Sequence, residues 1–145
     1  MKKIVYNDCF GGFGLSPIAT KLYAQKKGIT LTFYKQTKYS FDKKTGGINE
    51  FMKINDIENY DSHSIHAYTK DFGDIFDGKC TNEDFYYPTI KRDDVDLVYI
   101  VETLGKKANG NCANLKIIEI EGKWRIDEYD GYESVETPNT YKWND

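Results

Sequence analysis

The chain has 145 residues and a mass of 16.8 kDa, and we expect residues 1–145 to form a single domain. Lys and Arg total 20 against 23 Asp and Glu, so the net charge of −3 argues against DNA or RNA as a non-specific partner. Aromatic residues reach 15%, an excess that suits stacking on a ligand, a subunit interface or a core.

The amino terminus predicts neither a signal peptide nor a membrane segment. Lys2 and Lys3 are followed by a short apolar stretch that stops at Asn7 and Asp8, and no apolar run approaches the roughly 18 residues of a membrane span. We therefore expect a cytoplasmic protein that does not bind membranes. The three cysteines lack C-x-x-C spacing, which favours reduced thiols over a disulfide framework.

The first quarter of the chain reads as a strand, a glycine turn and a helix. Residues 2–8 contain Ile, Val and Tyr and lead into three closely spaced glycines, which predicts a strand that ends in a turn. Ser16 is a favoured N-cap residue and Pro17 suits the first helical position. A helix is therefore predicted from there to Gly28.

The middle of the chain predicts strands and then a long loop. Residues 29–39 alternate apolar and polar side chains, and residues 51–57 and 65–69 are shorter candidate strands, with a turn at Gly46 and Gly47. Residues 70–90 show no periodicity and are interpreted as a long ordered loop.

The last third predicts a helix followed by strands. Asp93 or Asp94 caps a helix whose apolar stripe comprises Leu97, Val98, Val101, Leu104 and Ala108. Residues 115–120 and 124–129 are interpreted as a hairpin with its turn at 121–123, followed by a strand over 132–135. The order β-α-β-β-β-α-β-β predicts an α+β fold, a mostly antiparallel sheet with two helices packed on one face.

The glycine turn is the strongest candidate for a ligand site. Gly11, Gly12, Phe13, Gly14 and Ser16 lie between a strand and a helix N-terminus, where backbone N–H groups and the positive end of the helix dipole attract phosphate. The spacing matches neither the P-loop nor the dinucleotide fingerprint G-x-G-x-x-G. The alternative, of about equal weight, is that the glycines only let the chain turn sharply and pack closely.

Several other residues are candidates for contacts to the same ligand. Arg92 and Arg125 suit bidentate contacts with phosphate, and their alternative role is surface charge. Asn109 suits a base or ribose edge, or serves the turn between helix and strand. Lys38 and Tyr39 complete the set of expected ligand-binding residues.

No catalytic or metal-binding set is predicted. Cys9 precedes the glycine turn as a phosphatase thiolate would, but Leu15 stands where such a loop needs its arginine. His63 and His66 with Asp61 lack a third strong ligand at metal-binding spacing. We expect no metal, no cofactor and no enzymatic activity.

The segment Asn-Asp-Cys-Phe-Gly-Gly-Phe-Gly-Leu-Ser at 7–16 resembles a family of small phage and prophage proteins, most of them without assigned function. The match continues at Leu104-Gly105, at 108–110 and at Glu128-Tyr129-Asp130-Gly131, and a Trp stands near the end of the chain. The chain departs from the pattern at 93–95, where relatives tend to carry Asn-Asp-Pro.

The resemblance implies a small accessory protein that a virus uses inside a bacterial host cell. We therefore expect a phage protein that binds and sequesters a nucleotide-derived immune signal, such as a cyclic ADP-ribose derivative or a cyclic oligonucleotide, without cleaving it. We also expect a homo-oligomer whose subunits share the pocket. The alternatives are a protein-binding accessory module and a nucleotide-modifying enzyme that uses the same pocket.

Overall fold

The computed structural model describes residues 1–40, 48–59 and 65–138, with side chains described for 1–37, 50–58 and 65–138. The predicted turn at Gly46 and Gly47 and the residues His63 and Asp61 lie outside this part of the chain. The chain divides into two compact units, one formed by Met1–Tyr23 with Thr89–Asp145 and the other by Ala24–Pro88. Each unit is described by itself.

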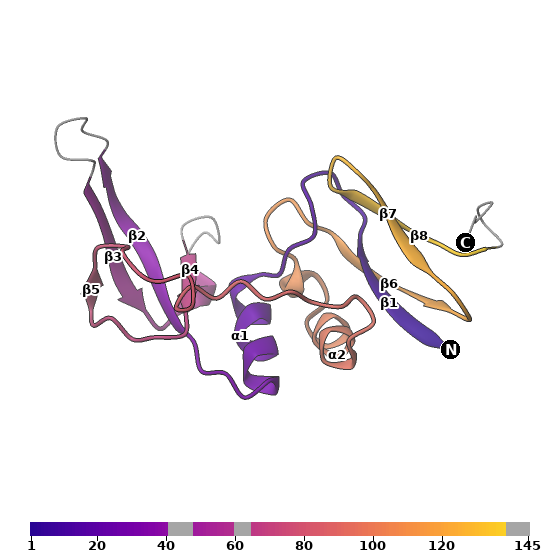
Figure 1. Ribbon diagram of the computed structural model, residues 1–145, viewed down its shortest axis with the longest axis horizontal. Helices are drawn as coiled ribbons and strands as arrows, with labels where there is room; N and C mark the ends of the chain where they lie inside the picture. Colours follow the sequence, from indigo (N-terminus) through magenta and orange to yellow (C-terminus); the bar gives the residue numbers. More distant parts are fainter. Residues whose placement is uncertain (41–47, 60–64, 139–145) are drawn as a thin grey trace. The chain divides into compact units, whose positions relative to one another are not determined.

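The fold is α+β with antiparallel sheets, as the sequence predicts (Figure 1). The strands form three separate sheets instead of one: β1 with β6, the four strands β4-β2-β3-β5, and β7 with β8. Among the described residues, no helix combines the length and the hydrophobicity that a membrane span requires.

Unit 1 is built on strands β1 (Lys2–Asn7) and β6 (Leu115–Ile120), which pair from Lys2 opposite Ile120 to Asn7 opposite Leu115. Ile4 and Val5 point to opposite faces of β1 by strand alternation, and both are fully buried, so β1 is covered on both faces. Helix α2 (Val95–Leu104) contacts β1 and β6 and lies beside them in Figure 1.

Both predicted helices are present in the expected places. Helix α1 (Pro17–Lys26) begins directly after Ser16, whose Oγ accepts a hydrogen bond from the Ala19 amide at 3.2 Å, as an N-cap residue does. Asp94 caps α2 by accepting a bond from the Asp96 amide, and the 3₁₀ turn η3 (Gly105–Ala108) follows the helix. The core of unit 1 comprises Val5, Ala19, Tyr23, Leu97, Val98, Ile100, Val101, Ala108 and Leu115.

The predicted hairpin of residues 115–120 with 124–129 is wrong. β6 pairs with β1, while β7 (Arg125–Tyr129) pairs with β8 (Tyr132–Glu136). Asp130 and Gly131 form the connecting turn with φ values of 49° and 85°, the positive values that match a two-residue turn to the twist of its strands. The hairpin therefore turns at Asp130 and Gly131 and not at the predicted residues 121–123.

Unit 2 contains three strands near the predicted positions, β2 (Thr32–Ser40), β3 (Ile48–Ile54) and β4 (Ile65–Tyr68). The strand predicted over 51–57 is shifted, because it ends at Ile54 and Ile57 begins the 3₁₀ turn η1 (Ile57–Asn59). Residues 70–90 are not only loop, because β5 (Ile75–Phe76) pairs with β3. A strand of two residues is too short to show periodicity, so the sequence pattern missed it.

Aromatic rings form the core of unit 2. Tyr34, Phe51, Tyr68 and Phe76 are buried together, and Phe72 packs against them. The Tyr34 hydroxyl donates to the Gly73 carbonyl at 2.8 Å and accepts from the Phe72 amide at 2.8 Å, so the phenol oxygen is satisfied inside the cluster. Burial raises the pKa of Tyr68 to about 12. Part of the aromatic excess therefore fills this core.

Candidate functional site

Three backbone segments of unit 1 meet at the glycine turn. The Gly11 amide donates to the Asp130 carbonyl at 3.3 Å, and the Gly110 amide donates to the Gly14 carbonyl at 2.9 Å. A Cβ on Gly131 would lie 2.3 Å from the Gly12 nitrogen, and a Cβ on Gly110 would lie 2.8 Å from the Gly14 carbonyl carbon. Close packing of backbone on backbone therefore explains several of these glycines.

Gly12 differs from Gly11 in its surroundings. A Cβ on Gly11 would lie 2.4 Å from the Cys112 Cβ, whereas a Cβ on Gly12 would meet nothing within 4 Å. Gly12 has a φ of 101°, so it still needs glycine for its backbone conformation. The turn is thus packed at Gly11 and at the Gly12 nitrogen, and it is open on the side to which a Gly12 side chain would point.

Consecutive backbone amides on this turn keep their hydrogen-bonding capacity. Within the described residues, no acceptor contacts the N–H groups of Phe13 and Gly14, whereas the Gly12 nitrogen closes a turn over Phe10 and Gly11 and lies against the Gly131 backbone. An exposed amide finds its partner in solvent or in a ligand, and successive amides on a glycine turn suit an anionic oxygen.

Arg92 is held by an internal ion pair. Its guanidinium binds the Glu133 carboxylate through both terminal nitrogens, with Nη2 to Oε2 at 2.9 Å, and lies 3.6 Å from the centre of the Phe13 ring. Glu133 is 6% exposed and also accepts the Asn7 amide at 2.9 Å. The structure therefore uses Arg92 to neutralise a buried carboxylate and to hold Phe13 in place.

Ser16 and Asn109 are engaged by neighbouring backbone. The Ser16 hydroxyl donates to the Lys107 carbonyl at 2.6 Å while it caps α1. Asn109 Oδ1 accepts a hydrogen bond from the Leu115 amide at 2.8 Å, within the turn that connects η3 to β6. Both side chains thus have structural roles, which the sequence had offered as the alternative to ligand binding.

The remaining predicted ligand residues are not brought to the glycine turn by any described contact. Arg125 pairs with Glu136 across the β7–β8 hairpin at 3.3 Å. Lys38 and Tyr39 lie on β2 in unit 2, and their side chains lie outside the described part. Cys9, the candidate thiolate that the sequence argued against, is a half-buried free thiol.

An aromatic pair beside the turn was missed by sequence reasoning. The rings of Phe10 and Tyr132 are 5.1 Å apart, and Phe10 is 58% exposed and Tyr132 39% exposed. Phe10 precedes Gly11, and Tyr132 follows Gly131, whose backbone packs on the turn. Recognition of the Asp-Gly hairpin turn would have placed Tyr132 at the start of a strand but not beside Phe10.

A charged triad fixes Tyr132. Its hydroxyl donates to Asp8, and the ammonium of Lys116 contacts the same carboxylate. The hydrogen bonds from Lys116 and Tyr132 lower the pKa of Asp8, and the bond to Asp8 raises the pKa of Tyr132. The aromatic pair therefore has a defined orientation at neutral pH.

Lysines without ion pairs lie on a neighbouring segment. Lys106 and Lys107 occupy η3, whose Lys107 carbonyl accepts the Ser16 hydroxyl, and both are exposed. Within the described residues, neither forms an ion pair. The same part of the chain holds no group of three or more His, Cys, Asp or Glu arranged to bind a metal.

No protein-family model, no curated protein and no solved structure matches this chain.

Proposed function

We propose that the protein binds and sequesters a nucleotide-derived signal without cleaving it. The observation that carries the proposal is the juxtaposition in unit 1 of the amides of Phe13 and Gly14 with the exposed rings of Phe10 and Tyr132. The amides bind a phosphate oxygen and the rings stack on the base, the two chemical features that nucleotides share.

Electrostatics support an anionic ligand of modest charge. The carboxylates of Asp8 and Glu133 are neutralised by Lys116 and Arg92. Lys106 and Lys107 add positive charge on the adjoining segment. In this proposal the phosphate is held by backbone amides, with the two lysines contributing attraction through solvent.

The resemblance of residues 7–16 to small phage and prophage proteins supports a role in infected bacteria. A protein that depletes an immune signal needs tight binding, which favours an enclosed site. Because Phe10 is largely exposed, we propose that a second copy of the chain covers the ligand in a homo-oligomer.

The proposal is tested with lysate from cells in which TIR-domain or cyclase signalling has been triggered. Purified protein is incubated with the lysate and removed, and both the filtrate and the material released by heating are analysed by mass spectrometry. We expect one nucleotide to disappear from the filtrate and to return intact. Return of an altered nucleotide would indicate an enzyme, and an unchanged filtrate would contradict the proposal.

A matched pair of variants locates the site. Phe10→Ala removes an exposed ring, and loss of stacking is expected to weaken binding about 5- to 150-fold. Tyr99→Ala removes another ring of unit 1 with similar exposure, 57%, on α2 and leaves affinity unchanged. Equal affinity of Phe10→Ala and the unmodified protein, measured by calorimetry with the recovered nucleotide, would place the ligand elsewhere.

A further inference from the structure

The cations that lie against the glycine turn are neutralised by carboxylates of the protein itself. Lys116 pairs with Asp8, which precedes the turn, and Arg92 pairs with Glu133 through both terminal nitrogens. The hydrogen bonds that Asp8 receives lower its pKa, so this carboxylate keeps its charge in weakly acidic solution. The two pairs therefore leave no net positive charge beside the free amides of the turn.

The β7–β8 turn adds two carboxylates at the same place. The Asp130 carbonyl accepts the Gly11 amide at 3.3 Å, and Glu128 accepts the Gly131 amide at 2.9 Å. Both acidic side chains are exposed, and within the described residues neither forms an ion pair. Fixed negative charge therefore exceeds fixed positive charge at this turn.

Lys106 and Lys107 offset this excess only through solvent. Both lie exposed on η3, and it is the carbonyl of Lys107, not its ammonium, that contacts Ser16. Charges that interact through water are screened over a Debye length of about 8 to 10 Å. The site as a whole is thus close to neutral, which suits a ligand group with one negative charge.

The phosphates of nucleotides differ in charge. A phosphodiester carries one negative charge, whereas a terminal phosphomonoester has a second pKa of about 6 and carries a charge of about −1.5 to −2 at pH 7. Binding of the doubly charged form is typically assisted by Arg or Lys side chains with donors to spare. The described contacts of Arg92 and Lys116 commit both cations to carboxylates.

We propose that the nucleotide site selects a phosphodiester and discriminates against a terminal phosphomonoester. This selectivity rests on the proposed function, because it concerns the phosphate that the amides of Phe13 and Gly14 hold. The exposed aromatic pair stacks on the base, and Glu128 and Asp130 repel the second charge of a monoester.

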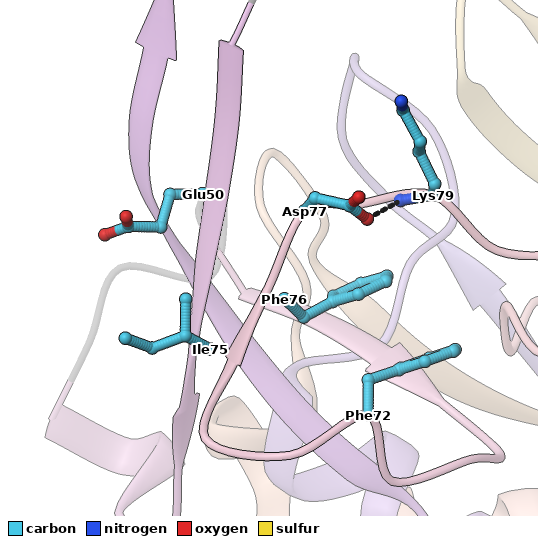
Figure 2. Close-up of a pocket in the computed structure, with 6 residues that line it drawn as sticks. All are labelled: Glu50, Phe72, Ile75, Phe76, Asp77 and Lys79. Carbon is cyan, nitrogen blue, oxygen red and sulfur yellow. Dashed lines mark hydrogen bonds between the residues drawn. The ribbon is translucent and has the colours of Figure 1, made fainter.

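A hollow of about 510 Å³ in unit 2 lacks this combination of groups. Its lining comprises Glu50, Phe72, Ile75, Phe76, Asp77 and Lys79 (Figure 2). Phe72 and Phe76 stack on each other with ring centres 4.1 Å apart, so each ring has one face covered. The Lys79 ammonium points away from both rings in Figure 2. The amides of Phe76 and Asp77 therefore serve as a control for binding outside the nucleotide site.

The first test repeats the capture from lysate after treatment with alkaline phosphatase, which hydrolyses terminal monoesters and leaves diesters intact. The phosphatase is removed before the protein is added, and we expect the same nucleotide, with unchanged mass, to be captured. Loss of capture after the treatment would overturn the selectivity and leave the proposed function standing. Capture of no nucleotide from either lysate would contradict the proposed function itself.

The second test compares adenosine 3′,5′-cyclic monophosphate with adenosine 5′-monophosphate, titrated into ¹⁵N-labelled full-length protein and followed by NMR. We expect the diester to shift the amides of Phe13 and Gly14 with the same affinity at about pH 5 and about pH 7.5, on either side of the monoester's second pKa. The monoester is expected to bind about two- to fivefold more weakly at the higher pH and to approach the diester at the lower.

The diester does not titrate in this range, so it reports any effect of pH on the protein itself. Equal affinity of the two probes at the higher pH, tighter binding of the monoester, or shifts confined to Phe76 and Asp77 would overturn the selectivity. Absence of shifts with the diester would overturn it as well.

A pair of variants assigns the discrimination to the β7–β8 turn. Asp130→Asn removes one carboxylate and retains a residue type that tolerates the φ of 49°, so the discrimination at the higher pH is expected to fall about twofold. Glu121→Gln is the control, because Glu121 follows Ile120, which pairs with Lys2 at the end of β1 away from the glycine turn. Equal effects of the two substitutions would overturn the role of the turn in favour of net charge.

Discussion

At the scale of single residues, the polar groups of unit 1 are satisfied by partners distant in sequence. Asn7 is fully buried, accepts the Asn114 amide at 2.8 Å and donates to the Gly131 carbonyl at 2.9 Å. Glu133 joins Asn7 to Arg92. The residue types of Arg92 and Asn109 indicated hydrogen bonding. Only the tertiary structure reveals that their partners are groups of the protein itself, the Glu133 carboxylate and the Leu115 amide.

Removal of Arg92 tests the buried ion pair. Arg92→Met leaves the Glu133 carboxylate buried and unpaired, and we expect it to lower the free energy of unfolding by about 3 kcal/mol. The double variant with Glu133→Gln is expected to recover part of this loss, because the amide oxygen still accepts the Asn7 amide. Urea unfolding measures both, and additive losses would contradict the coupling of the two residues.

His66 provides a pH-dependent prediction. Burial lowers the pKa of His66, whose ring packs edge-on against Phe51 at 5.4 Å. Because the folded pKa lies below the ordinary value of 6.5, the unfolded state binds the proton more readily, and stability falls as the pH drops through and below 6.5. His66→Phe is expected to flatten this dependence.

The measurement is urea unfolding at several pH values, together with an NMR titration of the His66 ring. A titration midpoint at or above 6.5 would contradict the direction of the pKa shift.

At the scale of elements, local sequence signals predicted the helices and the positions of individual strands, but they did not predict which strands pair with each other. The Ser16-Pro17 start of α1 and the Asp94 cap of α2 were predictable because capping depends on neighbouring residues. The partner of β6 was not, because both β1 and β7 offered suitable alternation. Pairing is a choice among distant segments, so short-range patterns leave it undecided.

Two glycine substitutions test the packing of the β7–β8 turn. Gly131→Ala places a Cβ 2.3 Å from the Gly12 nitrogen, whereas Gly122→Ala, at a similar φ of 79° against 85°, meets nothing within 4 Å. We expect Gly122→Ala to cost about 1 kcal/mol, from backbone strain alone. Gly131→Ala is expected to cost at least about 2 kcal/mol more, because backbone must move.

Thermal or urea unfolding of the two variants provides the comparison. Equal losses would mean that the hairpin turn does not pack on the glycine turn.

At the scale of the whole molecule, the chain builds two cores of different character. Aliphatic side chains of α1, α2, β1 and β6 form most of one, and aromatic rings of β2 to β5 form the other. Unit 1 presents the proposed nucleotide site, at the glycine turn.

Hydrogen exchange tests the independence of the two cores. Phe76→Ala removes a ring that stacks on Phe72 at 4.1 Å, and such a truncation is expected to cost about 3 kcal/mol or more. We expect faster exchange in β2, β3 and β4 while β1 and β6 retain protection. Equal loss of protection in both units, measured by mass spectrometry, would show that they unfold together.

The sequence by itself determined the α+β class, both helices with their caps, and the positions of most strands, because periodicity and capping act over a few residues. Only the tertiary structure decided that the strands form three sheets, that Gly11, Gly110 and Gly131 serve backbone packing, and that Arg92 is paired with Glu133. It also brought Phe10 to Tyr132 and placed β5 at one end of the four-stranded sheet. These features depend on contacts between residues far apart in the chain, whose energies no local pattern records.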